Sequence, residues 1–104
     1  MRIFVDDKVD AAIDDFYDAA LRLHRNTLSE ETVMHRKDKL YDGIRILGNE
    51  HVIFSKARLK KEWIDSGWYE YICEGFHFAY ELCKDENGEP YVWVHDAEHS
   101  LLYR

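Results

Sequence analysis

The spacing of apolar residues changes along the chain. In the first half they recur every three or four positions, and in the last third they largely alternate with polar residues. The first spacing is typical of a helix with one buried face, and the second of a strand with one buried face. The sequence therefore predicts an α+β fold. Because no linker, repeat or low-complexity segment interrupts the pattern, we expect a single domain over residues 1–104.

The N-terminal segment predicts a strand followed by a helix. Residues 1–5 (MRIFV) are apolar and favour a strand, which we expect to join the sheet. Asp6 and Asp7 can cap the N-terminus of a helix, where free N–H groups and the helix dipole favour carboxylates. The helix is predicted over residues 8–24, because its apolar residues form one stripe: Val9, Ala12, Ile13, Phe16, Tyr17, Ala20, Leu21 and Leu23.

A second helix is predicted to begin near Leu28 and to end at Gly48. Thr27 and Glu30 have the spacing of a capping box, and Gly is the usual residue just beyond a helix. The short link to the first helix predicts an antiparallel helical hairpin. Gly43, inside the helix, indicates close packing on a neighbour.

The segment between this helix and residue 67 has no single interpretation. Residues 49–55 fit a short strand or a buried loop, and residues 57–65 fit a long strand or a basic connecting turn.

Residues 68–95 predict three antiparallel strands joined by turns at Glu74-Gly75 and Asn87-Gly88. Two-residue turns at both places put one set of side chains on a common face, with Tyr91 at its margin. This is the expected core face: Tyr69, Tyr71, Cys73, Phe76, Phe78, Tyr80, Leu82, Trp93 and His95. The opposite face would carry Trp68, Glu70, Ile72, His77, Ala79, Glu81, Val92, Val94 and Asp96. This second face is either a partner or substrate surface or an ordinary solvated face.

Net charge, apolar runs and cysteines limit the functions and the cellular location that we expect. The formal net charge of −7 argues against generic nucleic-acid binding, which usually needs a positive surface. No apolar run is long enough for a membrane helix, and the N-terminus lacks the layout of a signal peptide, so we expect a cytoplasmic protein. Cys73 and Cys83 fall on opposite faces of the predicted sheet, which disfavours a disulfide.

Two histidine patterns are candidates for chemistry. His95 and His99 have a four-residue spacing that suits zinc on a helix, but no HExxH order or third ligand accompanies them, so no metal is expected. His77 lies diagonal to Glu70 and in the same strand as Glu81, and a carboxylate beside an imidazole can serve as base and acid. The alternative is a surface histidine beside solvated carboxylates.

The order strand, helix, helix and antiparallel strands, with GFHFAYEL, an NG turn, YVWVH and a closing HSLLY, resembles the RelE/ParE superfamily of bacterial toxins. The resemblance covers nearly the whole chain. It implies an N-terminal strand and helical hairpin packed on a three- to four-stranded antiparallel sheet. It also implies the toxin component of a type II toxin–antitoxin pair, with a cognate antitoxin as partner. The activity would be metal-independent, ribosome-dependent cleavage of mRNA, without a cofactor.

The resemblance also suggests roles for individual residues. The family places a phosphate-binding Arg just after the Gly of the first hairpin, and His77 stands at the matching position. Arg58, Lys60 and Lys61 are the candidates for RNA and phosphate contacts, and His95, His99 and Tyr103, with His77, are the candidates for catalysis. The alternative is a non-catalytic protein-binding module of the same fold, an inactive toxin homologue or a gyrase-type inhibitor. Such a module would use the open face with Trp68, Glu70, His77 and Glu81.

Overall fold

The computed structural model describes residues 1–49 and 54–101. Its elements follow the order β1 (Arg2–Val5), α1 (Asp7–Leu23), α2 (Glu30–Ile44), a 3-10 turn η1 (Arg45–Gly48), α3 (Lys61–Asp65), β2 (Tyr69–Cys73), β3 (Phe76–Lys84) and β4 (Pro90–His99). The α+β class is therefore confirmed. None of the helices within these ranges is long and apolar enough to cross a membrane.

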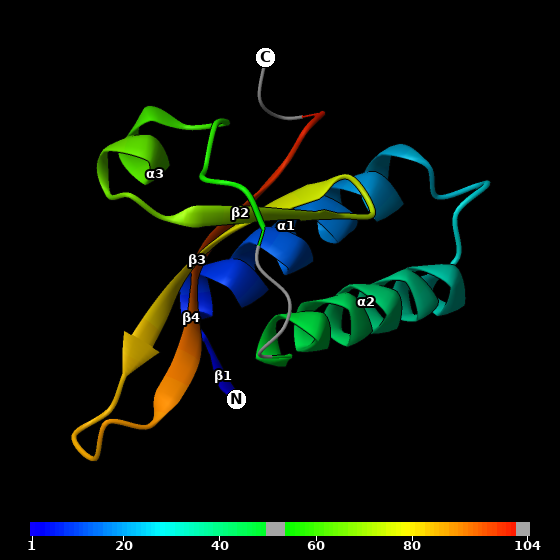
Figure 1. The fold of residues 1–104 in the computed structure, drawn as a ribbon. Coiled ribbons are helices and arrows are strands. Elements are labelled where there is room, and N and C mark those ends of the chain that lie inside the picture. The colour runs from blue at the N-terminus through cyan, green and yellow to red at the C-terminus, as the bar shows by residue number, and fades with distance from the viewer. Residues whose placement is uncertain (50–53, 102–104) are drawn as a thin grey trace.

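The strands form one mixed sheet in the order β1-β4-β3-β2. β2, β3 and β4 are antiparallel neighbours, whereas β1 runs parallel to β4. The expectation of an entirely antiparallel sheet was wrong for β1. β1 and β4 are not joined by a tight turn, because the helices and the strands β2 and β3 lie between them in the chain, so their connection does not require them to be antiparallel. In Figure 1, α1 and α2 lie on one side of the strands and α3 lies on the other.

α1 and α2 form the predicted hairpin. Asp6 caps α1, and its side chain accepts from the N–H of Lys8 at 3.0 Å. Lys37 of α2 reaches back to Asp14 of α1 at 3.0 Å, and the Tyr41 hydroxyl donates to Asp10. These contacts hold the two helices side by side.

The N-terminus of α2 corrects one prediction. Ser29, not Thr27, is the capping residue, and its hydroxyl accepts from the N–H of Thr32 at 3.1 Å. The Thr27 hydroxyl instead donates to the carbonyl of His24 in the preceding turn. The capping box fails because the turn after α1 continues through Thr27.

The main core lies between the sheet and the two long helices. It contains residues from both helices, from η1 and from one face of β3 and β4: Val9, Ile13, Tyr17, Val33, Leu40, Ile44, Leu47, Phe76, Phe78, Tyr80, Val92, Val94 and Ala97. Gly43 faces Cys73 of β2, and a Cβ added at Gly43 would lie 2.7 Å from the Cys73 Sγ. The predicted close packing at Gly43 is therefore confirmed.

The first hairpin follows the predicted register. Cys73 pairs with Phe76, and Glu74 and Gly75 form a two-residue turn with φ values of 51° and 81°. Both central residues have positive φ, as a type I′ turn requires. Phe76, Phe78 and Tyr80 consequently face the helices, as predicted.

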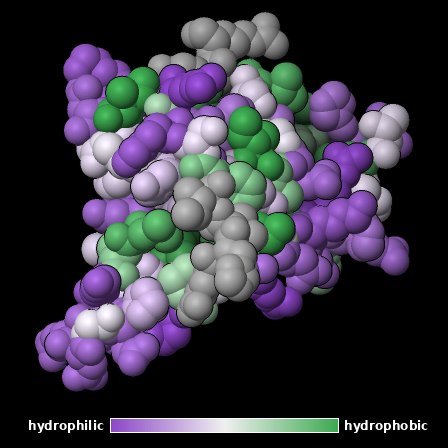
Figure 2. Space-filling view, viewed as in Figure 1, coloured by the Kyte–Doolittle hydropathy of each residue, from purple (hydrophilic) through white to green (hydrophobic). Residues whose placement is uncertain are grey.

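The second hairpin differs from the prediction. Lys84 pairs with Pro90, so five residues, not two, form the loop. The Asp85 side chain accepts from the N–H groups of Asn87 and Glu89 at 2.9 Å each, and these bonds stabilise the wider loop. Figure 2 shows the tip of this hairpin, at lower left, as hydrophilic.

The wider loop changes the faces of β4. Val92 now pairs with Leu82 and Val94 with Tyr80, so both valines are buried against the helices. The placement of Trp93 and His95 on the core face was therefore wrong, because a one-residue change in register turns every side chain over. A bulge follows, since Ala79 pairs with Asp96 and Tyr80 with Val94, which leaves His95 as the extra residue.

The ambiguous segment before β2 contains a short helix, α3. Its Trp63 is fully buried and packs with Ala57 over Ala79, which is also fully buried. The loop also bonds to the start of β2, because the N–H of Ala57 donates to the carbonyl of Trp68 at 2.9 Å. Of the ambiguous residues 49–55, residues 50–53 lie outside the described ranges. Cys73 and Cys83 are free thiols.

Candidate functional site

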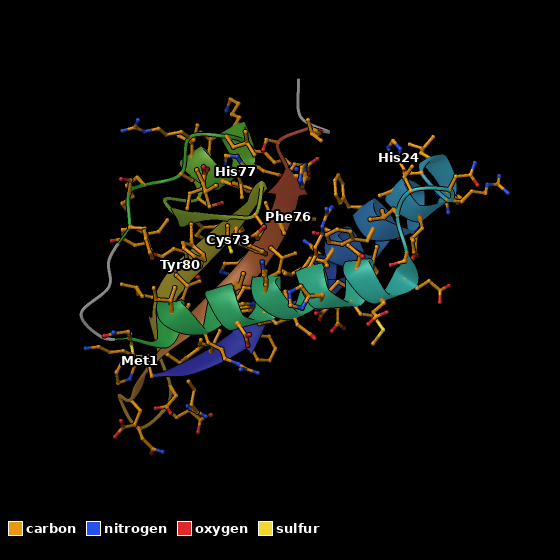
Figure 3. The ribbon with its side chains drawn as sticks, turned by 90° about the vertical axis from the view of Figure 1, so that its right-hand side faces the viewer. Met1, His24, Cys73, Phe76, His77 and Tyr80 are labelled. Carbon is orange, nitrogen blue, oxygen red and sulfur yellow. The ribbon has the colours of Figure 1, made fainter. Side chains whose placement is uncertain are left out.

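Ionisable and aromatic side chains gather on the sheet face that is opposite α1 and α2. We call this surface the α3 face, and its strand residues are Glu70, Ile72, His77, Ala79, Glu81, Trp93, His95, Asp96 and Glu98. Figure 3 shows His77 on the side of α3, whereas Cys73, Phe76 and Tyr80 lie nearer α2. The face was expected to be open. It is instead partly covered by Trp63, which divides it into two parts over Ala79.

The first part contains a carboxylate–imidazole pair. Glu70 and His77 are diagonal neighbours on β2 and β3, and Glu70 Oε2 lies 2.8 Å from His77 Nδ1. The other oxygen of Glu70 accepts from the N–H groups of Arg58 and Leu59 at 3.1 Å each. The pair is therefore held in place by the loop that leads into α3.

Burial and hydrogen bonding act in opposite directions on Glu70. Burial alone would raise the pKa of its carboxyl group, but the bonds from His77, Arg58 and Leu59 stabilise the charged form and lower that pKa below its usual value. The Nε2 of His77 makes no hydrogen bond within the described residues. This nitrogen also reaches solvent. Among the described residues, the Trp93 indole nitrogen is the one buried side-chain polar atom without a hydrogen-bond partner, so the unpartnered Nε2 of His77 is not buried.

Lys60 lies in a group of carboxylates beside this pair. Its Nζ is 3.1 Å from Glu62, 3.5 Å from Glu98 and 3.9 Å from Asp96. Burial would lower the pKa of Lys60, but the three carboxylates outweigh that effect and raise it. Asp96 also accepts from the Trp63 indole N–H at 3.0 Å. Lys60 is thus an internal counter-ion that holds α3 on the sheet.

The other two predicted phosphate-binding residues have partners different from those of Lys60. Lys61 is exposed and pairs with Asp65 within α3. Arg58 is exposed and contributes its backbone N–H to Glu70.

The second part of the α3 face is an aromatic stack. The His95 ring lies between Trp68, at 4.1 Å and 9° between planes, and Trp93, at 4.4 Å and 29°. Its Nε2 lies 2.8 Å from Glu81 Oε1. Phe4 of β1 extends the stack, because its ring meets Trp93 edge-on at 5.6 Å.

The two histidines of this face have different carboxylate partners. His77 and Glu81 are four residues apart on one strand, which corresponds to about 13 Å. His95 is bonded to Glu81, and Trp63 covers Ala79 between the two sites. The two imidazoles therefore belong to separate parts of the α3 face.

His99 lies on the opposite side of the sheet from His95. Its ring stacks on Phe16 of α1 at 3.9 Å, and its Nδ1 accepts from the N–H of Leu101 at 3.1 Å. Burial and the nearby His77 lower its pKa. Helical spacing does not apply to His95 and His99 in a strand, and no metal-binding cluster of His, Cys, Asp or Glu occurs in residues 1–49 and 54–101. Tyr103 lies outside the described residues.

Two tryptophans of this face were missed as site residues. Trp93 was assigned to the core because of the wrong turn length, and the Asp85 side chain was the signal that could have indicated a wider loop. Trp63 lies within residues 57–65, which had no single interpretation from the sequence. Its partner Ala79, a small residue between His77 and Glu81, left space on the sheet for an indole.

Comparison with protein-family models, curated proteins and solved structures finds no match to this chain.

Proposed function

We propose that this chain is a RelE/ParE-like toxin domain that acts by binding a protein partner rather than by cutting RNA. The order of β1, α1, α2 and three antiparallel strands, which the resemblance implies, supports the toxin-like part of the proposal. Within a toxin–antitoxin pair, the partners would be the target protein and the cognate antitoxin.

One observation carries the choice of binding over cleavage. Lys60, the most enclosed of the candidate phosphate ligands, is surrounded by Glu62, Asp96 and Glu98. A phosphate approaching Lys60 would meet three carboxylates, and the repulsion would offset the attraction to one ammonium group. The net charge of −7 also repels phosphate groups over longer distances.

The aromatic part of the α3 face suits protein recognition. Trp68, His95 and Trp93 form a continuous stack, and Phe4 beside it is 56% exposed. Large, rigid aromatic side chains are enriched at the energetic centres of protein interfaces. The acidic residues around the stack favour a partner with a basic surface.

The Glu70–His77 pair supports a second candidate function, ribosome-dependent RNA cleavage. A half-buried carboxylate bonded to Nδ1 orients the ring, and the free Nε2 could accept the proton of a ribose 2′-hydroxyl. If the chain cleaves RNA, the ribosome would supply the positive charge that stabilises the transition state.

Controlled expression in a bacterial host distinguishes the two functions. We expect the wild-type chain to arrest growth, and we expect His77→Asn to arrest growth equally, because binding does not need the imidazole. Trp93→Ala should relieve the arrest, since it removes the centre of the aromatic stack. Each variant would first be checked for wild-type folding by circular dichroism and thermal unfolding.

The controls decide the outcome. Ile72→Ala removes an exposed apolar side chain of the same face, away from the stack, and should leave the arrest unchanged. Relief of the arrest by His77→Asn but not by Trp93→Ala would favour the nuclease. Normal growth with the wild-type chain would contradict the toxin assignment.

A further inference from the structure

β1 lies at an edge of the sheet, and its outer backbone groups are unpaired. Phe4 is in register with Trp93, and the N–H of Asp6 donates to the carbonyl of Val94 at 2.9 Å. In a parallel pair the backbone groups of alternate residues point to the neighbour. The N–H and C=O groups of Ile3 and Val5 therefore point away from the sheet, and they have no partner within residues 1–49 and 54–101.

The free edge has defined ends. At one end, the Met1 ammonium group donates to the carbonyl of Gly48 at 2.8 Å, so η1 closes the edge there. At the other end, α1 begins at Asp7 and carries the chain away. The remaining edge is residues 2–6, and an exposed edge of this kind is a template for another strand.

We propose that this edge pairs with β1 of a second copy of the chain in an antiparallel, two-fold symmetric dimer. In the proposed register, Ile3 lies opposite Val5 of the second copy. Each such pair exchanges two backbone hydrogen bonds, and symmetry repeats the pair. The register uses every free backbone group of Ile3 and Val5.

The side chains of this register are complementary. Phe4 lies opposite Phe4 of the second copy, and Arg2 lies opposite Asp6 of the second copy, on both sides of the axis. In an antiparallel pair, side chains at non-hydrogen-bonded positions lie closer together than those at hydrogen-bonded positions. Aromatic pairs and pairs of opposite charge at such positions stabilise the pairing of the two strands. Phe4 is 56% exposed in the single chain. The Arg2 side chain pairs with Asp85 at 2.7 Å but remains 71% exposed, so Asp6 of the second copy would be a further partner for it.

Neighbouring registers are less favourable. Shifting toward the N-terminus would pair Val5 with Met1, where Gly48 already occupies the edge. Shifting the other way would place Phe4 opposite Asp6 and would pair Ile3 with Asp7, whose backbone is helical. Only the central register brings together unlike charges and like aromatic rings. The proposal stands independently of the toxin assignment.

Sedimentation equilibrium of the purified chain tests the dimer. The short edge predicts a weak association, with a Kd in roughly the micromolar range, so loading should extend from about 1 μM to about 1 mM. Phe4→Glu should weaken association at least about tenfold, because it places two carboxylates together at the axis. Ile72→Glu is the matched control, since Ile72 is 58% exposed on the other edge strand, and it should leave the dimer intact.

A charge exchange tests the register. Arg2→Glu should weaken association roughly tenfold by facing Asp6 of the second copy. Arg2→Glu combined with Asp6→Asn should recover part of that loss, and Asn still caps α1. A loss with no recovery would contradict the proposed pairing of residues 2 and 6.

Cysteine cross-linking provides the geometric test. Directly opposite residues at this position lie about 4.5 Å apart at Cα, close enough for a disulfide. Phe4→Cys should therefore form a covalent dimer on mild oxidation, whereas Ile72→Cys and the wild-type chain, with its own two thiols, should not. A wild-type chain that stays monomeric, or a dimer that Phe4→Cys does not cross-link, would overturn the proposal.

Discussion

Glu70 Oε2 lies 2.8 Å from Nδ1 of His77, and the second oxygen of the same carboxylate is bonded to two backbone N–H groups. This contact joins the loop before α3 to the middle of the sheet. It makes the attachment of the loop depend on the charge of Glu70.

Replacing Glu70 tests that dependence. The pKa of Glu70 is lower in the folded chain than its usual value of 4.5, so folding favours the carboxylate. The resulting stabilisation is present above about pH 4.5 and is lost as the pH falls through the folded pKa. The free energy of urea unfolding of Glu70→Gln should therefore fall less steeply below this pH than that of the wild type. Equal slopes would contradict the prediction.

His99 should cause a second loss of stability on acidification, which begins at a higher pH than the loss caused by Glu70. Burial against Phe16 lowers its pKa from the usual 6.5, so the unfolded chain takes up a proton before the folded chain does. Stability should then decrease as the pH falls from about 6.5 through the folded pKa. His99→Phe keeps a stacked ring without a titrating group. Its melting temperature should vary less than that of the wild type between about pH 5 and 7.

Control variants separate His99 from the other histidines. His24→Phe changes an exposed histidine beyond α1 and should leave the pH dependence as in the wild type. The same change in slope for both variants would show that His99 is not the responsible group.

Glu74 has a backbone conformation that is costly for its side chain. Its φ of 51° is the one positive value among the non-glycine residues that the structure describes. Asn tolerates this conformation better, so Glu74→Asn should raise the free energy of unfolding by about 0.5–1 kcal/mol. Glu86→Asn, in the loop of the other hairpin, lacks a positive φ and should change it little. Chemical denaturation of the three proteins checks the prediction.

Gly43 and Cys73 should show strong energetic coupling. Gly43→Ala would normally favour a helix by about 1 kcal/mol, but the new Cβ would lie 2.7 Å from the Cys73 Sγ. We expect Gly43→Ala to destabilise the chain by about 1–2 kcal/mol. In the Cys73→Ala background the same change should cost much less, because the sulfur is absent. A double-mutant cycle measures the difference, and additive effects would contradict the packing.

The sequence predicted elements where a local pattern decides them. The stripe of α1, its Asp6 cap and the turn at Glu74-Gly75 depend on residues close together in the chain. All three were correct, except that Leu23 at the end of the stripe is 78% exposed. The loop at Asn87-Gly88 was wrong because the Asp85 side chain bonds to Asn87 and Glu89 and stabilises a longer connection. That error placed Trp93 and His95 on the wrong face.

The candidate site was predictable only in part. Glu70 and His77 were correctly placed together, because the first hairpin fixes their register. The environment of Lys60 was not predictable, since Asp96 and Glu98 lie far from it in the sequence. The short α3 also lacks a pattern of its own, and it is Trp63 packing over Ala79 that holds it in place.

The central claim is that the chain binds a partner and does not cut RNA. Purified chain, added to ribosomes that are translating a defined mRNA, provides the most direct test when new mRNA ends are mapped by primer extension. We predict the same ends with and without the chain, even at excess over ribosomes. New ends in the presence of the wild-type chain that disappear with His77→Asn would contradict the account.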